Sequence, residues 1–182
     1  ASVTFKDVEF SYEERKILDH INIEIKPQTT TAIVGPSGSG KTTLCHLIAR
    51  FWDVQEGRIS IGGVDVRDIS KESLMDSIAF VFQQAHLFKT TLWDNLIYGK
   101  PNATKEEVSR AIDAAQCREI IDRLPDGLQT KIGAEGTYLS GGEQQRIVLA
   151  RAILKDAPIV VLDEATAFAD PENEYKMQQA LQ

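Results

Sequence analysis

The sequence has few cysteines and no long hydrophobic segment. Only 2 of the 182 residues are cysteine, and Cys45 and Cys117 lie far apart with no partner motif around them. Such isolated thiols indicate a reducing compartment rather than a fold held together by disulfide bonds. Uninterrupted apolar runs such as residues 79–82 and 159–162 are far shorter than the roughly 18 residues that a membrane span requires. We therefore expect no transmembrane helix within this sequence.

Basic residues are also in the minority. The chain has 20 Lys and Arg against 27 Asp and Glu, which gives a net charge of −7. A protein that coats nucleic acid phosphates needs a basic surface, so we expect no nucleic-acid partner. Residues 1–10 lack the charged start and apolar run of a signal peptide, so no export is expected. With 42% apolar and 26% charged residues, the composition is that of a soluble globular domain.

The hydrophobic pattern predicts a mixed α/β fold. Residues 8–12 and 21–25 alternate apolar and polar side chains and predict two half-buried strands, which favours an antiparallel pair. Residues 30–34, 77–82 and 159–162 are short apolar runs that predict buried strands, and strands separated by helices favour a parallel sheet. Helices are predicted over residues 41–50, 104–115, 117–124 and 140–154.

A glycine-rich segment between the strand expected at 30–34 and the helix expected at 41–50 matches G-x-x-x-x-G-K-[ST]. Its glycines let successive N–H groups turn inward as an anion-binding nest at a helix start. Lys41 adds a positive charge for the β- and γ-phosphates, and the Thr42 hydroxyl is placed to bind Mg²⁺. The predicted nucleotide-binding residues of this P-loop are Gly35, Ser37, Gly38, Ser39, Gly40, Lys41, Thr42 and Thr43.

Two carboxylates follow the apolar run at 159–162. A P-loop needs such an acidic element, because Mg²⁺ has to be held from a second side and a water has to be activated. The carboxyl ends of strands are where open α/β sheets bind ligands. We therefore expect Asp163 to bind Mg²⁺ or its water, and Glu164 to accept a proton from the attacking water. Without the P-loop upstream, a strand leaving the core would be the better interpretation.

Residues 139–146, with the sequence LSGGEQQR, resemble the L-S-G-G-x-Q signature of ATP-binding cassette (ABC) ATPases. The resemblance covers the whole chain and includes the P-loop and residues 159–164. It implies an α/β P-loop NTPase core with a mixed central sheet and an N-terminal antiparallel β-subdomain. This core would comprise residues 1–83 and 155–182, with an inserted α-helical subdomain at 84–154.

The same resemblance implies that the chain binds ATP and Mg²⁺ and hydrolyses ATP to ADP and phosphate. In this family the signature of one cassette closes over the ATP on the P-loop of another, which forms a head-to-tail dimer. Ser140, Gly141 and Gly142 would then bind the γ-phosphate from across the interface. This assignment also has a physical basis, since these residues open a predicted helix, and the start of a helix favours anions.

Three further residues take roles from the resemblance. Tyr12 matches the aromatic residue that stacks on adenine, although a buried strand tyrosine is the alternative. Gln83 matches the Q-loop glutamine, which reaches Mg²⁺ and the attacking water; a loop amide without a role is the alternative. Asp170 matches the D-loop aspartate at the dimer interface. The preceding Ala167 replaces the serine of the usual S-A-L-D, so that serine's hydrogen bond is not expected.

Two segments are similar to exporter cassettes in particular. Residues 130–136 resemble the X-loop, and residues 91–96 are similar to a segment that lies against transmembrane coupling helices. The resemblance therefore implies an exporter cassette at the cytoplasmic face of a membrane, with its transmembrane domain on the same chain. An importer ATPase subunit and a soluble ABC-class ATPase are the alternatives.

The family's switch histidine has no counterpart in this sequence. That histidine lies one strand and one helix beyond the D-loop, whereas His20, His46 and His86 all precede the D-loop. The resemblance thus implies that the C-terminal part of the fold is missing here and that the natural protein continues. We expect a chain of this extent to bind ATP and to hydrolyse it poorly.

Overall fold

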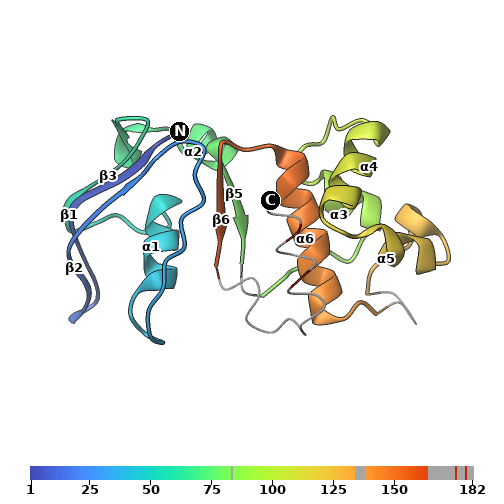
Figure 1. The fold of residues 1–182 in the computed structure, drawn as a ribbon, viewed down its shortest axis with the longest axis horizontal. Helices are drawn as coiled ribbons and strands as arrows, with labels where there is room; N and C mark the ends of the chain where they lie inside the picture. The colour runs from blue at the N-terminus through green and yellow to red at the C-terminus, as the bar shows by residue number, and fades with distance from the viewer. Residues whose placement is uncertain (83, 134–137, 164–174, 176–178, 180–182) are drawn as a thin grey trace. The chain divides into compact units, whose positions relative to one another are not determined.

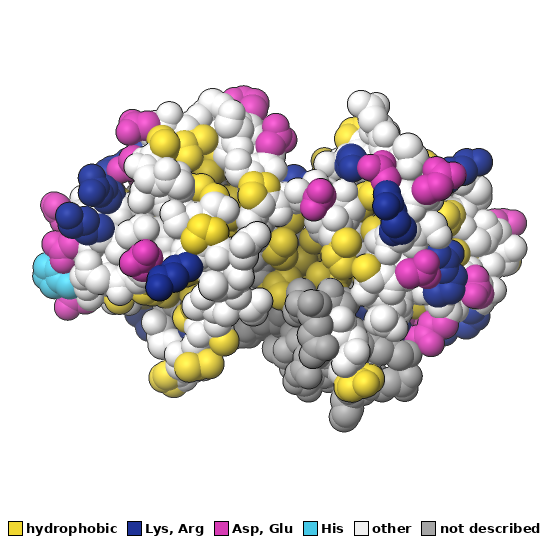
Figure 2. All heavy atoms as spheres, turned by 45° about the horizontal axis from the view of Figure 1, so that its top comes forward, with side chains coloured by type: hydrophobic (Ala, Val, Ile, Leu, Met, Phe, Trp, Pro, Cys, Tyr) yellow, Lys and Arg dark blue, Asp and Glu magenta, His cyan; other side chains and the backbone are white. Residues whose placement is uncertain are grey.

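The computed structural model of the chain describes residues 1–82, 84–133, 138–163, 175 and 179 (Figure 1). The chain divides into two compact units, Ala1–Ile78 and Ala79–Gln182. Figure 2 shows acidic and basic side chains interspersed on the face in view. Every helix among the described residues is too short or too polar to cross a bilayer.

The first unit is built on an antiparallel sheet. Strands β1 (Val3–Tyr12), β2 (Arg15–Ile25), β3 (Glu56–Ile61) and β4 (Val64–Asp65) lie in the order β2-β1-β3-β4, and each pair is antiparallel. The predicted antiparallel pair at 8–12 and 21–25 is confirmed, with Val8 opposite Ile21. One face of the sheet carries its core, which consists of Val3, Phe5, Val8, Phe10, Leu18 and Ile59.

Two short α-helices and a 3₁₀ turn accompany this sheet. They are α1 (Lys41–Ile48), η1 (Val66–Asp68) and α2 (Lys71–Ser77). Helix α1 buries Leu44, Leu47 and Ile48 along one side, which is the spacing of an amphipathic helix. This face anchors the start of α1, where the P-loop ends.

The strand predicted over residues 30–34 is not formed, so that prediction is wrong. Val34 is 88% exposed. A strand exists only when its N–H and C=O groups pair with a neighbouring strand. The apolar run indicates only that these residues suit a buried strand, and it carries no information about the partner.

The second unit combines a two-stranded sheet with a helical layer. Strand β5 (Ile78–Val81) pairs with β6 (Ile159–Leu162), and the Asp163 N–H donates to the Val81 carbonyl over 2.9 Å. That bond joins the carboxyl ends of both strands, so the strands are parallel, as the sequence predicts and as Figure 1 shows. The helices are α3 (Leu92–Ile97), α4 (Lys105–Ala114), α5 (Arg118–Arg123), η2 (Gly127–Gln129) and α6 (Gly141–Lys155).

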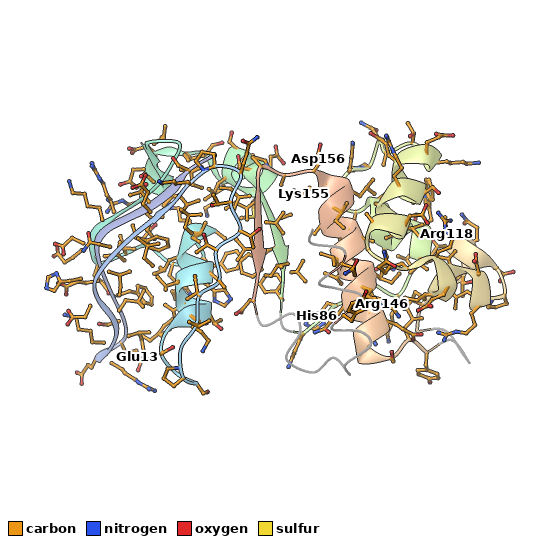
Figure 3. All side chains as sticks on the ribbon, in the orientation of Figure 1. Glu13, His86, Arg118, Arg146, Lys155 and Asp156 are labelled. Carbon is orange, nitrogen blue, oxygen red and sulfur yellow. The ribbon has the colours of Figure 1, made fainter. Side chains whose placement is uncertain are left out.

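Helix α6 is the centre of the second unit. Its Ile147, Leu149 and Ala150 are fully buried, and α6 packs against α3 and α4. It ends at Lys155, and the capping residue Asp156 has a left-handed φ of 53°; Figure 3 shows Lys155 and Asp156 at this end of the helix. Aspartate tolerates that conformation better than most residues.

Cys117 lies in the same core and is 0% exposed. Burial raises the pKa of its thiol to about 12, because the low-dielectric interior disfavours the thiolate. Cys45, in α1 of the first unit, is also buried. Both cysteines therefore serve as small core residues, as isolated buried thiols usually do.

Candidate functional site

The P-loop leads into a helix whose start has no side-chain cap. At α2, α3, α4 and α6 a Ser or Thr hydroxyl accepts a hydrogen bond from the third N–H of the helix. At α1 this position is Gly40, which makes no such bond. The first N–H groups of a helix have no intrahelical partner, and together they attract anions. The start of α1 is therefore suited to a phosphate group.

The glycines of the loop differ in how tightly their surroundings constrain them. Gly40 has φ +92°, and a Cβ atom there would lie 2.8 Å from Leu18 Cδ2. A Cβ atom on Gly35 would lie 2.8 Å from Ser39 Oγ. Gly38 has φ +77° with open space around it. The loop can thus keep this path only with glycine at Gly40, and a phosphate can approach its backbone closely.

The Lys41 side chain folds back over the loop. Its Nζ donates hydrogen bonds to the carbonyls of Gly35 and Pro36, each over 3.0 Å. The positive charge is therefore held above the same turn that presents the N–H groups. Thr42 is exposed in the first turn of α1, whereas Thr43 is 6% exposed and faces the interior of the unit.

Tyr12 ends β1 in the same unit as the P-loop. Its ring meets Phe10 edge-on at 4.9 Å between centroids, and meets Trp52 at 5.6 Å with an interplanar angle of 88°. Trp52 is 53% exposed. Trp52 was not predicted as a site residue, and its only signal in the sequence is an aromatic residue shortly after α1. The pair offers aromatic surface of the kind on which bases stack.

Asp163 follows β6 and is 6% exposed. Its backbone bond to Val81 fixes it at the carboxyl ends of β5 and β6, as the sequence predicts. A carboxylate oxygen such as that of Asp163 suits Mg²⁺, which keeps several waters and needs few protein ligands beside the phosphates. In the first unit, the Thr42 hydroxyl is an oxygen ligand that suits the same ion. Glu164, Gln83 and Asp170 lie outside the described residues.

The signature residues form a complete capping box at the start of α6. The Ser140 Oγ accepts from the Glu143 N–H over 3.3 Å, and Glu143 Oε2 accepts from the Ser140 N–H over 2.8 Å. Helix geometry leaves the N–H groups of Gly141 and Gly142 without intrahelical partners. A Cβ atom on Gly141 would meet nothing within 4 Å. These two N–H groups and the Ser140 hydroxyl proton are therefore available to a ligand.

Glu143 also pairs with Arg123, whose Nη2 lies 2.5 Å from Oε1. Burial by itself raises the pKa of Glu143. The bonds from the Ser140 backbone and from Arg123 outweigh that effect, so the pKa lies below its ordinary value. Glu143 is thus held in its charged form at the start of α6, where the helix dipole favours a negative charge.

The family model and the similar proteins found by comparison all indicate the same family. A family model described as ABC transporter matches residues 18–167. The chain is 51% identical over 181 residues to an ATP-dependent lipid A-core flippase of Desulfotalea psychrophila, covering 100% of the chain and 32% of that protein. It is 47% identical to the mycobactin import ATP-binding/permease protein IrtA of Mycobacterium tuberculosis, covering 100% of the chain and 21% of IrtA.

Among solved structures, the chain is similar to a bacterial Atm1-family ABC exporter with ATP bound. The TM-score is 0.91 at 40% sequence identity, over 99% of this chain and 32% of that one. The chain thus spans between 21% and 32% of the length of these relatives.

Proposed function

Because this chain belongs to the ABC transporter family, we propose that it is the ATP-hydrolysing cassette of an ABC exporter. Nucleotide binding follows from the family. The observation that carries the proposal of an ATP-hydrolysing cassette that works in pairs is that one chain contains two helix starts suited to phosphate. The start of α1 has glycine and Lys41, and the start of α6 has Ser140 and two further glycines. One cassette needs only one of them for its own nucleotide.

In the proposed reaction, the N–H groups of the loop and Lys41 bind the β- and γ-phosphates. Thr42 and Asp163 would hold Mg²⁺, which when bound neutralises charge on those phosphates. Gln83 and Glu164 act on the water. The water oxygen bonds to the γ-phosphorus, the bond from that phosphorus to ADP breaks, and Glu164 accepts the proton that the water loses. Positioning and charge neutralisation supply the rate enhancement.

The second helix start supports a head-to-tail dimer of cassettes. Ser140, Gly141 and Gly142 would contact the γ-phosphate on the P-loop of the partner, and Asp170 would lie at the interface. Phosphate at the start of α6 would be bound by the same physics as at α1. Closure of the dimer would then require ATP, because the bound ATP contacts both the P-loop of one cassette and the signature residues of the other.

An exposed aromatic surface on the second unit supports the proposal that the cassette contacts a transmembrane domain. Phe88 and Tyr98 are 44% and 65% exposed, and their ring centroids are 4.6 Å apart. The Arg151 guanidinium lies 5.5 Å from the Phe88 centroid. Exposed apolar surface of this kind commonly marks an interface. We propose that it contacts a transmembrane domain on the same polypeptide, at the cytoplasmic face of the membrane.

The direction of transport is proposed from relatives named as flippases and from a structure named as an exporter. Import is the second candidate, because relatives named mycobactin import proteins are 46% and 47% identical to this chain. Vesicle transport assays on the natural protein would distinguish the two directions.

The test separates binding from hydrolysis. Lys41→Ala should abolish ATP binding, measured by equilibrium dialysis with labelled ATP. Glu164→Gln should keep ATP binding, and in the natural full-length protein it should trap an ATP-bound dimer with little phosphate release. Equal turnover by Glu164→Gln and the wild type would refute the role of Glu164 as base.

A further inference from the structure

Strands β1 and β2 bring a histidine and three carboxylates together on the surface of the N-terminal sheet. His20 Nδ1 lies 2.7 Å from Asp7 Oδ1. His20 Nε2 lies 3.0 Å from Glu9 Oε1 and 4.0 Å from Asp19 Oδ1. At the end of the molecule where these strands lie, Figure 2 shows a histidine among acidic side chains. The nucleotide function proposed above uses none of these residues.

The three groups that face one another have the chemistry and spacing of a metal site. Ligand atoms of Glu9, Asp19 and His20 all lie within 4.8 Å of one another. In tetrahedral zinc sites the metal–ligand distances are about 2.0–2.2 Å, so neighbouring ligand atoms are about 3.3 Å apart. The distances of 3.0 and 4.0 Å from His20 Nε2 bracket that value. A small rotation of the Asp19 side chain would complete the arrangement.

Asp7 has the position of the group that orients a metal-binding histidine. Such a histidine usually donates its second ring N–H to a carboxylate, which fixes the tautomer and leaves the other nitrogen for the metal. Here Nδ1 faces Asp7, and Nε2 faces Glu9 and Asp19. We propose that Glu9, Asp19 and His20 bind a divalent cation of the Zn²⁺ class, with Asp7 as the orienting residue.

The local backbone holds these side chains in place. Asp7 and His20 have φ of 51° and 48°, and the β1–β2 register shifts between Phe5 and Val8. Asn22 connects the two irregular positions, because it accepts from the Asp7 N–H and donates to the His20 carbonyl, each over 3.0 Å. The shift in register turns both side chains to one surface, where a regular ladder would not place them together.

Lys16 is the cation that a metal would have to displace. Its Nζ lies 2.8 Å from Glu9 Oε2 and also pairs with Asp19. Once Lys16 has moved away, the two ligand carboxylates of Glu9 and Asp19 supply two negative charges, which match a divalent ion. The Lys16 side chain is 48% exposed, so it can move into solvent without loss of packing. The site therefore predicts competition between Lys16 and the metal.

The experiment is isothermal titration of ZnCl₂ into the metal-stripped chain without nucleotide at pH 7.5. We expect one ion per chain, and Mg²⁺ should not compete, because it does not favour imidazole. His20→Asn should weaken binding at least about 10-fold, since Asn tolerates the left-handed backbone but removes Nε2. Asp7→Asn should weaken binding about 10- to 100-fold. His86→Asn, which removes an exposed imidazole elsewhere, is the matched control and should bind as the wild type does.

Lys16→Met provides a test that does not depend on loss of folding, because it should tighten Zn²⁺ binding. Unchanged or weaker binding by Lys16→Met would overturn the proposal. So would equal Zn²⁺ affinity of His20→Asn and the wild type. In either case the cluster is a set of surface ion pairs around a protonated His20.

Discussion

Gly40 combines two constraints at one residue. Its backbone is left-handed, with φ +92°, and the space where a side chain would begin is occupied by Leu18 of β2. Gly38 has only the first constraint and Gly141 has neither. These three glycines therefore allow the contributions of backbone conformation and of close approach to be separated.

We expect Gly141→Ala to leave the free energy of unfolding nearly unchanged, because its surroundings are open. Gly38→Ala should destabilise the chain by about 1–2 kcal/mol, the cost of left-handed backbone for a residue with Cβ. Gly40→Ala should destabilise it further and also weaken ATP binding, because the loop has to shift away from Leu18. Urea denaturation of the three variants checks the order. A Gly40→Ala variant no less stable than Gly38→Ala would contradict the close contact.

Residues whose role depends on distant partners could not be found from the sequence. Lys41 and Thr42 were predicted because one contiguous segment contains the whole P-loop. Asn95 is 0% exposed, and its Oδ1 accepts from the Phe88 N–H and from Arg151, which is 56 residues away. Arg146 is likewise buried and donates to the Gln116 carbonyl over 2.6 Å. Spacing along the chain carries no sign of such partners.

Among the elements, the helices that carry a capping box were predicted from local sequence, whereas one of the predicted strands is not formed. The capping boxes at α4 and α6 contain both of their partners within three residues, and the structure forms both boxes. The strand expected at 30–34 needed a partner that its own sequence does not specify, and it is not formed. A helix makes its hydrogen bonds within itself, whereas a strand depends on residues elsewhere.

The capping box of α6 predicts a pH dependence. The Glu143 pKa is lowered from its ordinary value of 4.5, so the folded state favours the carboxylate. The stabilisation is therefore fully present above about 4.5 and is lost as the pH falls through the lowered pKa. Glu143→Gln keeps a side chain that can cap but loses the ion pair with Arg123, and should lose about 1 kcal/mol at neutral pH.

Urea denaturation between pH 7 and pH 3 would measure this effect. The difference in free energy of unfolding between the wild type and Glu143→Gln should shrink towards acid pH. Asp122→Asn, next to Arg123 on α5, is a control for removing one negative charge nearby. A difference that stays constant with pH would show that the charge of Glu143 contributes nothing.

For the molecule as a whole, a ligand that binds only the folded state raises its apparent stability. At a free ATP concentration of 100 times Kd the gain is about 2.7 kcal/mol. We expect ATP to raise the melting temperature of the wild-type chain and to leave that of Lys41→Ala unchanged. Thermal denaturation with and without ATP makes the comparison. An equal rise in both proteins would place the ATP-dependent effect outside the P-loop.

The burial of Cys45 and Cys117 has a practical consequence for testing the dimer. Thiol reagents need an accessible thiolate, and neither residue offers one in the folded state. A single cysteine introduced at an exposed position of the P-loop, paired with one in the signature, can thus be labelled or bridged selectively. These 182 residues therefore already provide a background for distance measurements between cassettes.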